Sequence, residues 1–84
     1  MELKARTPEQ IGQSLRRFRK AKGLTQKDIS DRTNLRVATI SSLENGDPGT
    51  QLRTLVSVLT ALDLEFVLQD RGKSTTLSIE DVFS

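Results

Sequence analysis

Short segments with helical apolar spacing, separated by residues that end helices, run from residue 7 to residue 62 of this 84-residue chain. Thr7 and Pro8 predict a helix start, because threonine caps free amides and proline suits the first helical position. Gln10 nearly completes a capping box with Thr7. Gly23 predicts the end of this helix near residue 22. The apolar stripe of the predicted helix consists of Ile11, Leu15 and Phe18.

Three further helices are predicted by the same signals. Thr25 and Asp28 form a capping-box pattern that begins a helix over about 26–33, and Asn34 tolerates the left-handed break after it. The next helix spans about 36–45, with Ile40 and Leu43 facing inward, and a loop follows at 45–49. The last helix, about 50–62, carries a broad apolar stripe made of Leu52, Leu55, Val56, Leu59 and Leu62.

The apolar period changes after residue 63. Leu64, Phe66 and Leu68 alternate with other residues, which predicts a strand over 64–69. A strand needs a partner for its backbone groups, and two partners are open: residues 75–79 of the same chain, or the same strand in a second copy. We expect residues 1–69 to form one domain. The polar segment 70–84 is a tail that can be disordered in isolation.

Cysteine and histidine are both absent from the chain. Their absence excludes disulfides and thiolate or imidazole metal sites, and it removes the most common general base. The sequence also has no glycine-rich phosphate loop. We therefore predict a binding protein without enzymatic activity, metal or cofactor.

The charges divide unevenly along the chain. Residues 1–36 carry ten basic and four acidic residues, which gives a net charge of +6. Residues 37–84 carry three basic and seven acidic residues, which gives a net charge of −4. A basic first half favours a polyanion as a partner, although the same residues could simply form a solvated surface. No apolar run approaches the roughly 20 residues that cross a bilayer, and the first residues are too polar for a secretory signal. We expect a soluble, cytoplasmic, nucleoid-associated protein with no membrane partner.

The segment from Gly23 to Gly46 predicts two short helices joined by about three residues. This is the geometry of a helix-turn-helix, whose second helix lies in the major groove of DNA. The groove is about 12 Å wide and admits one helix, whose outer face must be free of bulky apolar groups. The residues that the pattern places on this face are Arg36, Ala38, Thr39, Ser41 and Ser42.

Candidate phosphate contacts lie nearby in the sequence. Thr25 and Gln26 stand at the start of the first helix of the motif, where free amides and the helix dipole attract anions. Lys27, Arg16 and Arg17 add positive charge. Phosphate contacts set the register on the duplex, and base contacts set the sequence preference.

Residues 11–46 closely resemble the XRE/Cro-type helix-turn-helix family, in Leu24-Thr25-Gln26, Ile29-Ser30, Ala38-Thr39-Ile40-Ser41 and Glu44-Asn45-Gly46. Together with the segment 61–68, the chain looks like the HipB-type antitoxins, whose dimers are closed by a small sheet with one strand from each subunit. The resemblance implies a mainly α, lambda-repressor-like fold of four to five helices with one C-terminal strand in an intersubunit sheet. It also implies that Val37 joins the groove-facing residues, that Gln26 approaches a phosphate, and that Arg19 pairs with Glu44.

The sequence departs from the family at two positions of the second motif helix. Many relatives carry long amides there, whereas this chain has Val37 and Ala38. These side chains can touch a thymine methyl group but cannot form bidentate hydrogen bonds to adenine. Direct readout would then rest on Arg36, Thr39 and the serines, with DNA shape adding to it.

The resemblance implies a sequence-specific repressor that binds double-stranded operator DNA as a homodimer. It would be the antitoxin and autorepressor of an operon whose toxin is a HipA-like serine/threonine kinase, with Leu64, Phe66 and Leu68 in the dimer interface. Two alternatives stay open. One is a stand-alone phage-type repressor, and the other is a protein-interaction adaptor that does not read DNA.

Overall fold

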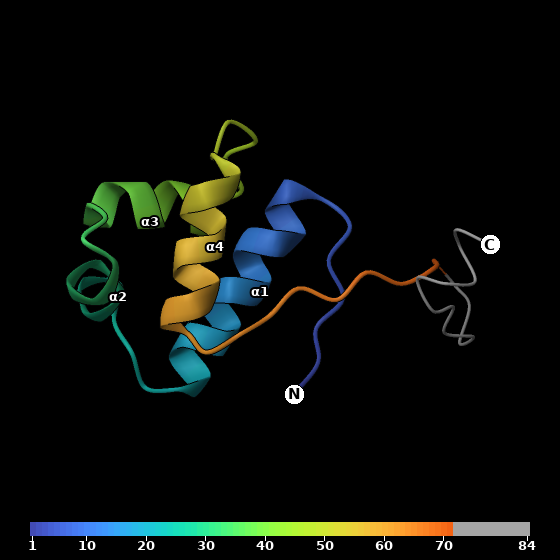
Figure 1. The fold of residues 1–84 in the computed structure, drawn as a ribbon, viewed down its shortest axis with the longest axis horizontal. Coiled ribbons are helices and arrows are strands. Elements are labelled where there is room, and N and C mark those ends of the chain that lie inside the picture. The colour runs from blue at the N-terminus through green and yellow to red at the C-terminus, as the bar shows by residue number, and fades with distance from the viewer. Residues whose placement is uncertain (72–84) are drawn as a thin grey trace.

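The structure, a computed structural model, describes residues 1–71. That part of the chain holds four helices, α1 (Pro8–Ala21), α2 (Gln26–Thr33), α3 (Val37–Glu44) and α4 (Leu52–Ala61). Their ends agree with the sequence prediction to within two residues. Figure 1 shows α4 between α3 and α1, with α2 beside α3. A mainly α fold with a helix-turn-helix at α2 and α3 is therefore confirmed.

Capping side chains and left-handed residues set the helix ends. Thr7 Oγ1 accepts a hydrogen bond from the N–H of Gln10 at 3.1 Å and so caps α1. The Gln10 side chain does not complete a capping box, because its oxygen instead accepts from the N–H of Arg6 at 2.7 Å. Asn34 (φ 62°), directly after α2, and Gly23 (φ +70°), two residues after the end of α1, take left-handed conformations.

The core is aliphatic and draws on all four helices. Ile29 of α2 and Ile40 of α3 are fully buried, so the inner faces of both motif helices are anchored in the core. Partly buried Leu24, Leu35 and Leu64 close the edges. The buried hydrophobic side chains are Leu15, Ile29, Ile40, Leu43, Val58, Leu59 and Leu62.

The apolar stripe predicted for α4 is partly wrong. Val58, which the stripe omitted, is 1% exposed, whereas Leu52 is 70% exposed and Val56 is 48% exposed. Successive helical residues are rotated by about 100°, which puts Val58 and Leu62 on one flank and Leu52 and Val56 on the other. The flank with Val58 and Leu62 packs in the core, and the flank with Leu52 and Val56 is exposed.

α1 packs directly on the backbone of α3 at Gly12. A Cβ atom at this position would lie 2.5 Å from the carbonyl oxygens of both Leu43 and Glu44. Glycine is therefore required for α1 to pack directly on the backbone at the end of α3. This contact places the C-terminal end of α3 against the N-terminal half of α1.

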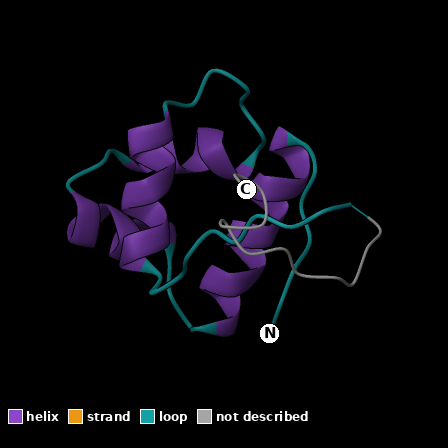
Figure 2. Cartoon of the chain, turned by 45° about the vertical axis from the view of Figure 1, so that its right-hand side comes forward, coloured by secondary structure: helices purple, strands orange, loops and turns teal. Residues whose placement is uncertain are grey.

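The segment that follows α4 forms no strand within residues 1–71. The N–H of Leu64 donates to the carbonyl oxygen of Leu59 at 2.8 Å, and the chain then runs out past the N-terminal residues (Figure 2). The predicted strand over 64–69 thus stays a prediction. Its candidate partner at 75–79, and the predicted tail from residue 72 onward, lie outside the described residues. None of the helices in residues 1–71 combines the length and the apolar character needed to cross a membrane.

Candidate nucleic-acid interface

α3 is anchored on its inner face and open on its outer face. Ile40 is fully buried and Leu43 is 4% exposed, and both belong to the core. Because each residue advances the helix by about 100°, Ala38, Ser41 and Ser42 lie on the half opposite the core. Val37 and Thr39 lie on the two flanks, and Arg36 is the N-cap residue before the first turn. Among these predicted groove-facing residues Thr39 and Ser41 are half-buried, and the exposed ones are Arg36, Val37, Ala38 and Ser42.

Side-chain hydrogen bonds hold the three-residue turn between α2 and α3. The N–H of Leu35 donates to Thr33 Oγ1 at 3.1 Å, and the hydroxyl of Ser30 donates to the carbonyl oxygen of Leu35. Both backbone groups of Leu35 are therefore fixed by α2. The orientation of α3 relative to α2 follows from this turn.

A buried ion pair connects α1 to the end of α3. Arg19 Nε lies 2.7 Å from Glu44 Oε2, and Arg19 Nη2 donates to Glu44 Oε1 at 3.0 Å. A third bond runs from Arg19 Nη1 to the carbonyl oxygen of Leu24 at 2.9 Å. The hydrogen bonding to Glu44 raises the pKa of the Arg19 guanidinium above its ordinary value, although burial acts in the opposite direction. The pairing that the family resemblance implied is confirmed.

Gln26, a predicted phosphate contact, belongs to the same network. Its Nε2 donates to Glu44 Oε1 at 3.1 Å. A carboxamide nitrogen carries two hydrogens, so one hydrogen is left to donate to another acceptor. Glu44 thereby links Arg19 of α1 to the first residue of α2 and restricts the orientation of the Gln26 side chain.

The start of α2 carries a complete capping box. The N–H of Asp28 donates to Thr25 Oγ1 at 3.0 Å, and the N–H of Thr25 donates to Asp28 Oδ2 at 2.8 Å. The hydrogen bonds from Thr25 hold the pKa of the Asp28 carboxyl below its usual value of 3.8. The negative charge of Asp28 opposes a phosphate at this helix start. A phosphate contact here must therefore come from the side chains of Gln26 and Lys27.

The remaining predicted phosphate contacts are exposed cations. Lys27 Nζ lies 3.3 Å from Asp31 Oδ1 in a solvent-exposed pair, which is a weak interaction. Arg16 follows Gly12 by four residues, so it stands on the flank of α1 that packs on α3. Arg17 stands about 200° around the helix from buried Leu15 and faces away from the core.

Two helix starts in the described part of the chain have no side-chain cap. They are the starts of α3, after Arg36, and of α4, after Gln51. Uncapped amides at a helix start favour anions. A hollow of about 320 Å³ lies between the two helices, and its lining includes four hydroxyl-bearing residues, Thr39, Ser42, Thr50 and Thr54.

The sequence patterns predicted a loop at 45–49 and a helix from about residue 50, and they missed the place of Thr50 and Gln51 beside α3. The sequence signal that could have revealed this place is Gln51, the residue before α4. Glutamine is outside the group of preferred N-cap residues, which predicts a helix start whose amides need another partner.

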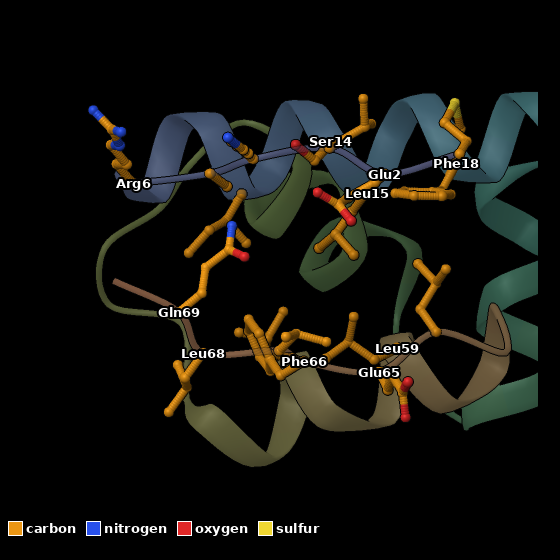
Figure 3. A pocket seen from close by; sticks show the side chains of 18 of the residues that line it. Glu2, Arg6, Ser14, Leu15, Phe18, Leu59, Glu65, Phe66, Leu68 and Gln69 are labelled. Carbon is orange, nitrogen blue, oxygen red and sulfur yellow. The ribbon is translucent and has the colours of Figure 1, made fainter. Parts of the chain in front are cut away.

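A second surface, which we call the α1–α4 groove, lies away from α3. Its volume is about 720 Å³, and it is lined by the N-terminal residues, α1, α4 and the segment 63–71. Figure 3 shows Leu15 and Phe18 of α1 on one side and Leu59 and Phe66 on the other. Of the predicted dimer residues, Leu64 is half-buried against the core, Phe66 is 52% exposed and Leu68 is 94% exposed.

Comparisons with known proteins agree with this geometry. The family model described as helix-turn-helix, HTH_3, matches residues 15–68. The antitoxin HipB of Escherichia coli K12 is 30% identical over 74 residues, which cover 88% of this chain and 84% of HipB. These relatives are regulators and antitoxins, so the prediction of a non-enzymatic protein is confirmed.

Two solved structures extend the likeness to three dimensions. The complex of HipB with the O4 20mer superposes with a TM-score of 0.77 at 31% identity and covers 81% of this chain and 96% of the HipB chain. The HipA–HipB–O2–O3 complex gives a TM-score of 0.76 at 31% identity and covers the same shares of the two chains, 81% and 96%.

Proposed function

Because this chain belongs to the helix-turn-helix family that includes the HipB antitoxins, we propose that it binds operator DNA as a symmetric homodimer and represses its own promoter. The observation that supports this most is the outer face of α3. Apart from Val37 and Ala38, its side chains are polar, and it is supported from inside by buried Ile40 and the Arg19–Glu44 pair. HipB itself is found in complex with the O4 20mer.

In this proposal α3 enters the major groove and its first residues meet base edges. Arg36 is suited to a guanine, and the hydroxyls of Thr39, Ser41 and Ser42 can donate to or accept from any base. The phosphate contacts come from the side chains of Gln26 and Lys27, next to Thr25, and from the cations of α1, with Arg16 better placed than Arg17. A dimer seated on the promoter would block polymerase by occupying the site.

The α1–α4 groove supports the homodimer. Residues 65–68 include exposed apolar side chains, and Leu52 and Val56 extend the apolar surface of Leu55 and Leu59 along α4. A second copy could cover this surface and pair its 64–69 segment with the same segment here. We propose that residues 1–69 are the binding and dimerisation domain.

The toxin partner is proposed from the relatives. HipB forms a complex with HipA together with O2 and O3. Acidic residues gather after α4, with Asp63, Glu65 and Asp70 all exposed. We propose that this end of the chain, together with residues 70–84, holds a HipA-like kinase while α3 stays on the DNA.

DNA binding is tested by fluorescence anisotropy with the region upstream of the protein's own gene and with a scrambled duplex. Arg36→Ala with Ser41→Ala should remove the preference for the upstream region. A matched control, Arg71→Ala with Ser57→Ala, removes the same groups from exposed sites away from α3 and should bind as the wild type does. Equal affinity of the wild type for both duplexes at moderate salt would refute specific repression. It would favour the adaptor.

The toxin partnership is tested by co-purification with the product of the adjacent gene. We expect a stable complex that still shifts the upstream duplex, because the proposed toxin surface and α3 are separate. The charge-reversed variant Asp70→Lys, which lies outside the 64–69 segment, should weaken the complex without changing DNA affinity. DNA binding by a protein that retains no neighbouring gene product would instead favour a stand-alone repressor.

A further inference from the structure

Val37 stands apart from the other exposed large hydrophobic residues of the described chain. Apart from Met1, the others are Leu52, Val56, Phe66, Val67 and Leu68, and all of them belong to α4 or the segment after it. Val37 is the first residue of α3, is 41% exposed and does not belong to the core cluster. Single exposed apolar residues are common on protein surfaces, so exposure alone does not indicate a function for Val37. Its position in the fold does.

That position is the turn of α3 that would reach base edges. The N-terminal residues of a recognition helix make the base contacts, and Val37 and Ala38 are the first two residues of α3. Both side chains are exposed and consist of carbon only. They have no donor or acceptor for the hydrogen-bonding groups of adenine, guanine or cytosine.

The major groove presents a single apolar group, the C5-methyl group of thymine. We propose that Val37, with Ala38 beside it, reads thymine methyl groups at the base pairs that face the first turn of α3. The neighbouring Arg36 is the only groove-facing cation at this end of the helix, so each half-site would combine a guanine contact with methyl contacts. This inference deepens the proposed function and rests on it.

The size of the effect follows from the area of one methyl group. Burying one carbon against an apolar surface contributes about 0.8 kcal/mol, which corresponds to about fourfold in affinity for one half-site. A symmetric dimer makes the contact twice, so removing both methyl groups should weaken binding by about 16-fold.

The test replaces thymine by deoxyuridine, one symmetric pair of positions at a time, in the operator found with the upstream region. Deoxyuridine keeps the base pair and removes only the methyl group. We expect one or two pairs of positions at which the wild-type affinity falls by about 16-fold, as estimated from methyl burial. At one of these pairs, a cytosine and a 5-methylcytosine operator are also compared, and the methylated form should bind more tightly.

The variant Val37→Ala assigns the effect to this side chain. It should bind the thymine operator more weakly than the wild type and lose most of its sensitivity to deoxyuridine at the same positions. Thr60→Ala, which trims another exposed β-branched side chain outside both the proposed DNA surface and the α1–α4 groove, should keep the full sensitivity. Circular dichroism checks that both variants are folded.

Three results separate the outcomes. Tight specific binding that is insensitive to every thymine-to-deoxyuridine change would overturn the methyl readout and leave the proposed function standing. Full sensitivity retained in Val37→Ala would overturn the assignment to Val37. Absence of any preferred duplex would overturn the proposed function and this inference with it.

Discussion

Glu44 receives hydrogen bonds from two side chains, Arg19 and Gln26, and is itself buried. In the described part of the chain, no buried side-chain nitrogen or oxygen lacks a partner. This full satisfaction explains how a buried charge pair is tolerated in so small a core. It also makes the pair sensitive to the loss of one member.

The variant Glu44→Gln keeps the shape of the side chain and leaves Arg19 with a buried, unpaired charge. We expect the free energy of unfolding to fall by about 3 kcal/mol, measured by urea denaturation. Asp31→Asn breaks the exposed pair with Lys27 and should cost less than about 0.5 kcal/mol. Equal, small losses in the two variants would show that the buried pair does not brace α1 against α3.

Asp28 gives the stability of α2 a pH dependence. Its pKa in the folded chain lies below the ordinary value of 3.8, because Thr25 donates hydrogen bonds to the carboxylate. The ionised form therefore adds stability above about pH 4, and this contribution is lost as the pH falls through the lower folded pKa. Asp28→Asn should be less stable than the wild type at neutral pH, and the difference should shrink in acid.

Urea denaturation at a series of pH values from 7 downward measures this difference. Asp31→Asn removes a carboxylate from the same helix and leaves the capping box intact, so the contribution of Asp28 should persist in it. If the difference in free energy of unfolding between the wild type and Asp28→Asn stays constant as the pH falls, the capping role of Asp28 is contradicted.

At the scale of helices, the packing of α1 on α3 depends on Gly12. Gly12→Ala places a Cβ atom 2.5 Å from two backbone oxygens, so a helix must shift. We expect a loss of about 1–3 kcal/mol in the free energy of unfolding, measured by urea denaturation. Gly49→Ala is the control, because its nearest neighbour is the Asp47 side chain at 3.3 Å. A wild-type unfolding curve for Gly12→Ala would show that the two helices have room to separate.

Local signals predicted the elements well, because the ends of these helices are set by their own residues. Thr7, Gly23, Thr25 and Asn34 act through hydrogen bonds or backbone conformations within a few residues. Residue patterns also predicted that Ile40 and Leu43 of α3 face the core. The Arg19–Glu44 pair came from the family resemblance alone, since 25 residues separate its members.

The parts that local signals missed depend on tertiary contacts. The apolar stripe of α4 is wider than the core can cover, and only packing decides that Val58 is buried and Leu52 is not. The hydrogen bond from Gln26 to Glu44 joins α2 to α3, so no periodicity reveals it. The strand over 64–69 depends on a partner segment, and a single pattern cannot choose between the two partners that remain open.

At the scale of the whole molecule, two open surfaces of different chemistry lie on separate sides of α4 (Figure 1). The outer face of α3 is on one side, and the segment after α4 leaves on the other side. A dimer joined through the α1–α4 groove would leave both copies of α3 uncovered. This arrangement is what a two-fold symmetric operator requires.

Phe66→Asp tests the proposed dimer surface. A charge at this half-exposed aromatic residue should raise the dimer dissociation constant by more than about tenfold, because two buried phenylalanine contacts are lost. Sedimentation velocity over a concentration series measures the change. Gln13→Asp adds the same charge at an exposed position of α1 that does not line the α1–α4 groove, and it should sediment as the wild type does. An unchanged dimer in Phe66→Asp would place the interface elsewhere.

The central claim is that α3 lies in the major groove of a two-fold symmetric site, and dimethyl sulfate probing of the upstream region tests it directly. This reagent methylates guanine N7 in the major groove and adenine N3 in the minor groove. We expect protection of guanine N7 in two clusters separated by about 10 base pairs or a multiple of this spacing. Protection confined to adenine N3, or a guanine pattern identical with and without the protein, would contradict the account.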